Sequence, residues 1–287
     1  MPSLAKHQSS SIVKLLALGD AKVGKTTSLV SLVKAGFKLR IIDMDNLLDS
    51  LVHAIKAECP DKIGNVEVRT IRDKLKMTAD GPVIDGMAKA FTDAIRMLNS
   101  WKYTEDGEEI DFGPPSSWPS DTILVIDSLS RLCDAAYNWR EQLTPKTGRS
   151  GADYDRRSIY KDAQDAVEET LAGLTSKNFS VNVIVIAHGV YMDQEDGTTK
   201  IFPQGVGSKL SPKIPQYFPT YIRYRNVNNK RSLQLKSDPT INLAVPQHFP
   251  DSLPVETGLA DLFRMLREQP QEATQAKPQA RPNLKRA

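Results

Sequence analysis

Apolar residues follow one another in three short runs along the chain, at 13–18, 123–126 and 181–187, almost without polar interruption. A strand that is apolar at nearly every position is buried on both faces, which is typical of a parallel sheet covered by helices on each side. The pattern therefore predicts an α/β fold with a mostly parallel central sheet flanked by helices. Two more strands are expected at 39–42 and 66–71. Helical spacing of apolar residues predicts helices at 26–34, 47–56, 83–99, 160–174 and 259–266.

Two later segments have the pattern of β-hairpins. Residues 190–202 hold Glu-Asp-Gly between two extended halves, and residues 221–235 hold Asn-Val-Asn-Asn in the same place. Such turn residues between extended runs favour antiparallel pairing. We therefore expect antiparallel hairpins as additions to the C-terminal part of the parallel core.

The two ends of the chain have the composition of tails. Residues 1–10 are rich in Ser, and residues 267–287 are rich in Gln, Pro and Ala, so neither end has enough apolar residues to join a core. Residues 11–266 are expected to form a single domain between two disordered tails. The C-terminal tail is basic, and we interpret it as solubilising rather than as a contact for nucleic acid or a single-strand-binding protein. Its basic residues are Lys277, Arg281, Lys285 and Arg286.

Charge and cysteine content exclude several classes of protein. The 287 residues include 38 Lys and Arg against 35 Asp and Glu, a net charge of +3, which excludes a histone-like binder but permits a local basic groove. The only two cysteines, Cys59 and Cys133, are expected to be free thiols in a reducing cytosol. No apolar run approaches the ~20 residues that span a bilayer, and the first residues lack the apolar core of a signal peptide. We therefore expect a cytoplasmic protein with no membrane segment.

A phosphate-binding loop is the strongest chemical signal in the sequence. Residues 19–26 match GxxxxGK[ST] between an apolar strand and a predicted helix, the context that this motif requires. Its glycines let backbone amides surround the phosphates, while Lys25 reaches the β and γ phosphates and the Thr26 hydroxyl binds Mg²⁺. The sequence thus predicts a site for ATP and Mg²⁺. Its residues are Gly19, Asp20, Ala21, Lys22, Val23, Gly24, Lys25, Thr26 and Thr27.

An acidic residue that ends a second apolar strand completes the predicted metal site. Asp127 follows Thr-Ile-Leu-Val-Ile, the form of a Walker B element, and is expected to hold Mg²⁺ through water, opposite Thr26. The alternative is that Asp127 caps the start of the next helix, a common place for aspartate.

Two branches of the P-loop proteins have motifs that this sequence lacks. The loop resembles that of Ras-like GTPases, but that family also needs a DxxG after Asp127 and an NKxD motif, and the sequence has neither. Partitioning ATPases of the ParA type carry a lysine directly after the first glycine of the loop, where this chain has Asp20.

The ends of two other strands resemble the RecA-like branch. Ile-Ile-Asp43-Met-Asp45 is similar to the segment in which RecA-type recombinases place the glutamate that activates water, and the alignment puts that role on Asp45, with Asp43 as the alternative. Both carboxylates could instead cap the following helix. Val-Ile-Val-Ile-Ala-His188 is similar to the sensor strand of that branch, expected between the two Walker strands with His188 at the γ-phosphate. The alternative is a histidine that faces solvent.

Taken together, residues 13–266 resemble phage-encoded RecA-like ATPases of the single-strand-annealing or recombination type, described as AAA-domain nucleotide-binding proteins. The resemblance implies a Mg²⁺-dependent ATPase that binds single-stranded DNA, forms a homo-oligomer and acts in the host cytoplasm, with a single-strand-binding protein as a candidate partner. DNA-binding loops are then expected at 144–157 and 191–209. A basic residue that acts on a neighbouring protomer's nucleotide would come from the late hairpin, with five candidates: Arg223, Arg225, Lys230, Arg231 and Lys236.

Three other functions compete with this interpretation. The first is an ATP-dependent switch that acts on a protein partner without DNA. The second is a nucleotide-binding module that hydrolyses ATP hardly at all, because Asp45 is one methylene shorter than glutamate. A small-molecule kinase is the third, and it is disfavoured because the sequence has no Arg-rich lid.

Overall fold

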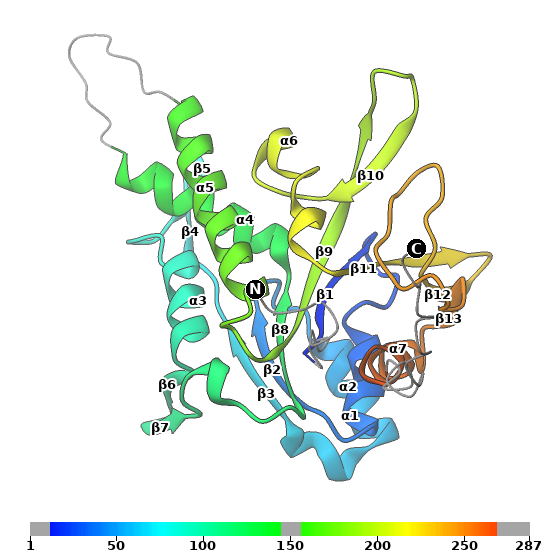
Figure 1. Cartoon of the computed structure of the whole chain (residues 1–287). Coiled ribbons are helices and arrows are strands. Elements are labelled where there is room, and N and C mark those ends of the chain that lie inside the picture. The colour runs from blue at the N-terminus through cyan, green and yellow to red at the C-terminus, as the bar shows by residue number, and fades with distance from the viewer. Residues whose placement is uncertain (1–11, 145–155, 269–287) are drawn as a thin grey trace, which may run out of the picture.

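A mixed β-sheet forms the centre of the protein in a computed structural model that describes residues 12–144 and 156–268 (Figure 1). The strands lie in the order β13-β12-β11-β1-β9-β8-β2-β3, and β10 pairs with β9 outside this row. Their bounds are β1 (Lys14–Gly19), β2 (Lys38–Asp43), β3 (Val66–Thr70), β8 (Thr122–Asp127), β9 (Asn182–Asp193), β10 (Thr199–Pro203), β11 (Thr220–Val227), β12 (Lys230–Gln234) and β13 (Ser252–Pro254).

The part of the sheet from β11 to β3 is parallel throughout, so the carboxyl ends of these strands meet at one edge. Gly19 at the end of β1 pairs with His188 in β9, and Asp43 at the end of β2 pairs with Asp127 at the end of β8. The prediction that the sensor strand lies between the Walker strands is confirmed, because β9 lies between β1 and β8. The register therefore places residues from four strands at one edge.

Helices cover both faces of the sheet (Figure 1). Side chains of β1 alternate between two apolar cores, with Leu15 and Ala17 in one and Leu16 and Leu18 in the other. The prediction of strands buried on both faces, and with it the α/β fold class, is confirmed. On the face of Leu15 lie α1 (Val30–Lys34), α2 (Asp49–Glu58) and α7 (Gly258–Arg267). On the face of Leu16 lie α3 (Ala90–Asn99), α4 (Leu129–Leu143) and α5 (Arg156–Thr175).

The helix predicted at 83–99 is wrong in its first third. A strand, β5 (Gly81–Ile84), pairs there with β4 (Leu75–Thr78), and the helix begins only at Ala90. The backbone of Gly81 and Gly86 adopts φ of +115° and +84°, which a helix does not allow, so the apolar pair before Asp85 joins a hairpin instead. The helix predicted at 26–34 begins as a 3₁₀ turn, η2 (Thr27–Leu29), before α1.

Helix α4 was not predicted, and neither was the hairpin of β6 (Lys102–Glu105) and β7 (Glu108–Asp111). Both predicted hairpins of the C-terminal half are confirmed, as β9–β10 and β11–β12.

The remaining helical elements are short. They are η3 (Pro60–Asn65), η4 (Pro115–Ser117), α6 (Gly207–Leu210) and η5 (Ile214–Tyr217).

Some predictions fall on residues that the structure does not describe. These are the N-terminal tail, nearly all of the C-terminal tail and the greater part of the predicted DNA-binding loop 144–157. Within the described ranges, no helix has both the length and the apolar character needed to cross a membrane.

Candidate functional site

The loop that follows β1 needs glycine at two positions. A Cβ on Gly19 would lie 2.9 Å from the Tyr224 Cβ of the neighbouring strand β11, closer than side chains approach one another. Gly24 has a φ of +97°, in the left-handed region that only glycine enters readily. Lys22 also has a positive φ, of 63°. The glycines of the motif thus let the loop turn tightly against β11.

Lys25 lies folded back across this loop. Its Nζ donates to the carbonyl oxygens of Gly19 at 2.8 Å and Asp20 at 2.6 Å, and only 6% of the residue is exposed. Burial lowers the pKa of the Lys25 ammonium, while the carboxylates of Asp127, Asp20 and Asp45 act in the opposite direction. An ammonium has three N–H donors, so one donor is left for a phosphate oxygen.

Thr26 and Asp127 come together from distant parts of the chain. The Thr26 hydroxyl donates to Asp127 Oδ2 at 2.6 Å, and Asp127 is 4% exposed. Burial raises the pKa of the Asp127 carboxyl from 3.8 to about 6, the neighbouring charges of Asp45 and Asp43 add to this, and Thr26 and Lys25 oppose it. Asp127 does not cap the following helix, since α4 has no side-chain cap and begins after Ser128.

This pair of residues fits Mg²⁺. A hydroxyl and a carboxylate are the hard oxygen ligands that Mg²⁺ takes, and the ion usually keeps several waters and binds substrate phosphates besides one or two protein groups. A buried carboxylate whose ionised form is disfavoured also gains from a nearby cation. In the described part of the chain, no three His, Cys, Asp or Glu side chains form an all-protein metal site. The donor set therefore matches a cation shared with a nucleotide.

Asp45 and His188, which the sequence suggested separately, are in contact. The His188 Nε2 lies 3.3 Å from Asp45 Oδ2, and Arg131 Nε lies 3.2 Å from Asp45 Oδ1. The Asp45 side chain is 11% exposed. Burial alone would raise the pKa of this carboxyl, but the hydrogen bond from His188 and the charges of His188 and Arg131 outweigh it, so the pKa is lowered.

Asp43 has a different environment. It is buried, and its Oδ1 accepts hydrogen bonds from the backbone amides of Asp45 at 3.1 Å and Asn46 at 2.7 Å, while its Oδ2 accepts from the Thr70 hydroxyl at 3.2 Å. These bonds hold the turn that presents Asp45. The helix α2 has no side-chain cap, so neither carboxylate caps it. Asp43 is thus used by the turn, whereas the two Asp45 oxygens meet side chains from α4 and β9.

Five basic residues were candidates for a role at a neighbouring protomer's nucleotide. One of them, Arg231, lies against the phosphate-binding loop of its own chain. The Cδ and Nη1 atoms of Arg231 lie 3.6 and 3.7 Å from the place of a Cβ on Gly24. Arg223 is buried and donates to Thr240 and Tyr191, and Arg225 pairs with Asp238 at 3.6 Å. The two lysines differ: Lys236 donates to the Gln247 carbonyl, and Lys230 is exposed.

Sequence reasoning missed two residues of this region. Arg131 lies in the first turn of α4, and its position four residues after Asp127 was the available signal. Tyr191 in β9 donates to Asp20 Oδ2 at 3.4 Å and accepts from Arg223 Nη2 at 3.3 Å. The sequence placed Tyr191 only at the start of the predicted DNA-binding loop 191–209, and these contacts were not predictable because the partners come from β11 and from the loop after β1.

A glycine loop after a parallel strand, a lysine folded over it and a Thr–Asp pair at its end define a P-loop nucleotide-binding protein. Residues 12–242 match the family model described as AAA domain. The match covers most of the chain, so the protein belongs to the AAA-domain family. No curated protein matches the sequence.

Two solved structures are similar to the chain at low identity. The crystal structure of the RadB recombinase is 12% identical, with a TM-score of 0.43 over 87% of this chain and 90% of that one. A prototypical ATPase from the type III secretion system of pathogenic bacteria is 13% identical, with a TM-score of 0.38 over 74% of this chain. The match spans 50% of that ATPase chain.

Proposed function

We propose that the protein is a Mg²⁺-dependent ATPase that binds single-stranded DNA and assists phage recombination, strand annealing or replication. The observation that carries the ATPase is the arrangement at the carboxyl edge of the sheet. There the loop lysine, the Thr26–Asp127 pair and the Asp45 carboxylate converge from different strands.

Each residue has a role that follows from its position. The amides of the loop and Lys25 bind the β and γ phosphates, and Thr26 with Asp127 holds the cation. Mg²⁺, when bound, neutralises the charge that develops on the phosphate oxygens. Asp45 orients a water for in-line attack and takes its proton. His188, hydrogen-bonded to Asp45, detects whether the γ-phosphate is present.

DNA binding is supported by the path of β9. The strand continues from His188 beyond the sheet edge to Asp193 and pairs with β10, so one continuous hairpin joins the predicted sensor to the exposed surface (Figure 1). Lys200 and Phe202 lie on β10, and Lys209 follows in α6. Positive charge beside an aromatic ring suits a single strand with unstacked bases.

Steady-state ATP hydrolysis with and without a single-stranded oligonucleotide tests this function. We expect turnover to rise with DNA, and we expect salt to weaken the effect because phosphate contacts release counterions. Turnover that is indifferent to DNA at low salt would contradict the DNA-dependent function. A double exchange, Lys200→Gln with Lys209→Gln, should lower the stimulation, whereas the matched control Lys34→Gln on α1 should not.

A switch that acts on a protein partner is the second candidate, and the hairpin β4–β5 favours it. Leu75 and Met77 are 60% and 81% exposed, and their cross-strand partners are Ile84 and Pro82, so one face of this hairpin is apolar and open. DNA-independent turnover would favour this candidate.

The proposed function also includes an oligomeric assembly of this chain. We infer a homo-oligomer in the host cytoplasm, with a single-strand-binding protein as a further partner. Light scattering of the purified protein, with and without ATP and DNA, measures the oligomeric state, and a monomer under all conditions would contradict it.

A further inference from the structure

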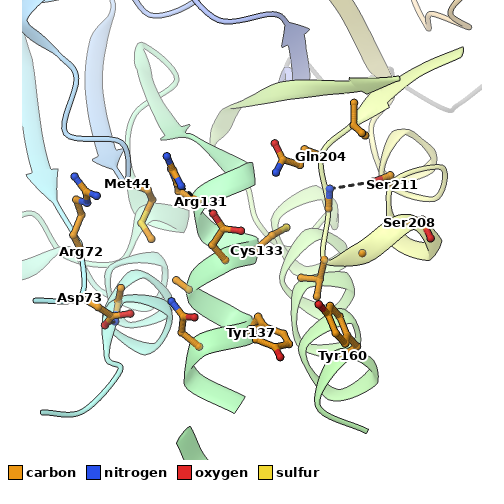
Figure 2. Close-up of a pocket in the computed structure, with 18 of the residues that line it drawn as sticks. Met44, Arg72, Asp73, Arg131, Cys133, Tyr137, Tyr160, Gln204, Ser208 and Ser211 are labelled. Atoms are coloured by element: carbon orange, nitrogen blue, oxygen red, sulfur yellow. Dashed lines mark hydrogen bonds and ion pairs between the residues drawn. The ribbon is translucent and has the colours of Figure 1, made fainter. Parts of the chain in front are cut away.

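The hairpin of β9 and β10 has two different faces where it leaves the sheet. On one face, Val190 and Met192 line a cavity of about 710 Å³ beside α4 (Figure 2). The walls of this cavity carry two arginines and two aspartates, so their charges balance: Arg72, Arg131, Asp73 and Asp134. Tyr191 lies between the two apolar residues in the strand, so its side chain points to the opposite face of the hairpin.

On that face, Tyr191 joins the loop after β1 to a buried arginine. Its hydroxyl donates to Asp20 Oδ2 at 3.4 Å and accepts from Arg223 Nη2 at 3.3 Å. A Cβ on Gly189 would lie 3.6 Å from Asp20 Oδ1, so the carboxylate also lies against the backbone of β9. The acidic side chain of the phosphate-binding loop is therefore directed at the hairpin.

Arg223 supports the tyrosine from inside the sheet. It lies in β11 and is 8% exposed. Its Nη1 donates to the Thr240 hydroxyl at 3.0 Å, and Thr240 donates in turn to Asp238 Oδ1 at 2.6 Å. The guanidinium is thus joined through one hydroxyl to Asp238 and through the other to Asp20. A hydroxyl that accepts from a cation is polarised into a stronger donor, so Arg223 strengthens the bond to Asp20.

A carboxylate in a phosphate-binding loop works against the binding of a nucleotide. The Asp20 carbonyl oxygen accepts from Lys25 Nζ at 2.6 Å, so the Asp20 side chain begins beside this ammonium. Burial lowers the pKa of Lys25, and the charges of Asp127 and Asp20 oppose this, so the Asp20 charge reaches the ammonium. Lys25 has one N–H donor left, and a carboxylate accepts it as readily as a phosphate does. An Asp20 side chain turned toward Lys25 would therefore compete with ATP.

We propose that Tyr191 is a positioning residue for ATP: backed by Arg223, it holds the Asp20 carboxylate against the hairpin and keeps the remaining donor of Lys25 available to the phosphates. This inference rests on the proposed ATPase and names a residue outside the loop motif that sets the affinity of the loop for nucleotide. Tyr191 acts through Asp20 and not on the reacting atoms. Its loss should therefore raise KM for ATP and leave kcat nearly unchanged.

A double-mutant cycle on nucleotide affinity tests this role. The probe is an ATP analogue with a fluorescent N-methylanthraniloyl group on its ribose, titrated with protein in the presence of Mg²⁺ and without DNA. Tyr191→Phe removes only the hydroxyl and should weaken binding about two- to fivefold, the size of a half-exposed interaction with a charge. Asp20→Asn removes the competing charge and should bind the analogue at least as tightly as the wild type. In the Asp20→Asn background, Tyr191→Phe should cause no further loss.

The matched control is Tyr217→Phe. The Tyr217 hydroxyl also donates to a carboxylate, that of Glu168 at 2.9 Å, and Glu168 also has a cationic partner, Lys213. These residues belong to α5 and the segment before β11 and are not joined to Asp20, so the control should leave the dissociation constant unchanged. Steady-state turnover gives a second readout, in which Tyr191→Phe should raise KM for ATP and keep kcat within about twofold. Circular dichroism of each variant checks that the fold is intact.

The outcomes separate this inference from the proposed function. If the wild type binds the analogue and Tyr191→Phe behaves as the control does, the positioning role is overturned and the ATPase stands. A loss that persists in the Asp20→Asn background also overturns it, because Tyr191 would then act through the hairpin and not through Asp20. Weaker binding by Asp20→Asn alone overturns it as well, since the carboxylate would then be needed for the nucleotide. A wild type that binds no nucleotide overturns the proposed ATPase itself.

Discussion

The substitution Asp127→Asn should make the protein more stable while it removes a ligand of the proposed cation site. Asp127 is 4% exposed, and among the residues that the structure describes its charge is offset by the Thr26 hydroxyl and Lys25. Asparagine keeps the size of the side chain and an oxygen that can accept from Thr26. The exchange thus removes the buried charge and little else.

The magnitude follows from the pKa of this carboxyl, which burial raises from 3.8 to about 6. A raised pKa means that the folded state holds the proton more tightly than the unfolded state, so wild-type stability falls as pH rises between these two values. Roughly two pKa units at 1.36 kcal/mol each amount to about 3 kcal/mol above pH 6. Below pH 3.8 the two proteins should be nearly equal, because the carboxyl is protonated in both states.

Urea unfolding of the metal-free, nucleotide-free protein measures this difference. We expect Asp127→Asn to raise the free energy of unfolding by about 1–3 kcal/mol at pH 7 and by almost nothing near pH 4. The control Asp93→Asn removes a half-exposed carboxylate of α3 and should change stability by less than about 0.5 kcal/mol. An Asp127→Asn protein that is less stable than the wild type at pH 7 would refute the reasoning.

Three other substitutions test the close approach at Gly19, the helical glycine Gly173 and the proposed base Asp45. Gly19→Ala places a Cβ 2.9 Å from Tyr224 Cβ and should destabilise the protein by about 1–3 kcal/mol in urea unfolding, and a neutral effect would contradict the close approach. Gly173 lies inside α5, and a Cβ there would meet no other atom within 4 Å. Gly173→Ala should therefore stabilise the protein by up to about 1 kcal/mol, and a loss of stability would contradict the helix-propensity argument. Asp45→Asn should lower single-turnover ATP hydrolysis at least about 100-fold while ATP still binds, and unchanged hydrolysis would exclude Asp45 as the base.

The sheet could be predicted well because its signals are local. Runs such as 123–126 are apolar at every position, so both their strand character and their burial on two faces follow from composition. The glycine loop was equally clear, since its function needs fixed residue types at fixed spacing. The prediction that β9 lies between β1 and β8 came from the resemblance to the RecA-like branch and not from the pattern.

The wrong secondary-structure predictions fall in segments whose conformation depends on tertiary contacts. Residues 83–89 have an apolar spacing that fits a helix, but Gly81 before them and Gly86 among them have positive φ, and the segment forms a strand and a loop instead. Helix α4 was not among the predicted helices, because it carries a mixture of polar and apolar residues directly after a strand. These elements are defined by turns and partners rather than by hydrophobic period.

The candidate site could be predicted residue by residue but not as an arrangement. The sequence named Asp45 and His188, yet only the fold shows that they are 3.3 Å apart and that Arg131 lies on the other carboxylate oxygen. Likewise, five basic residues on the late hairpin were indistinguishable until the structure placed Arg231 against Gly24. Contacts across strands depend on register, which the sequence alone does not specify.

The central claim is that the loop with Lys25 binds and hydrolyses ATP. Mg²⁺-dependent ATP hydrolysis by the wild type and by Lys25→Ala, with circular dichroism of both proteins, tests it most directly. We predict that the wild type hydrolyses ATP and that the variant keeps its fold but loses turnover, because Lys25 donates to loop carbonyls rather than joining the apolar core, and its proposed role is to bind phosphate. A folded Lys25→Ala protein with full turnover would contradict the account.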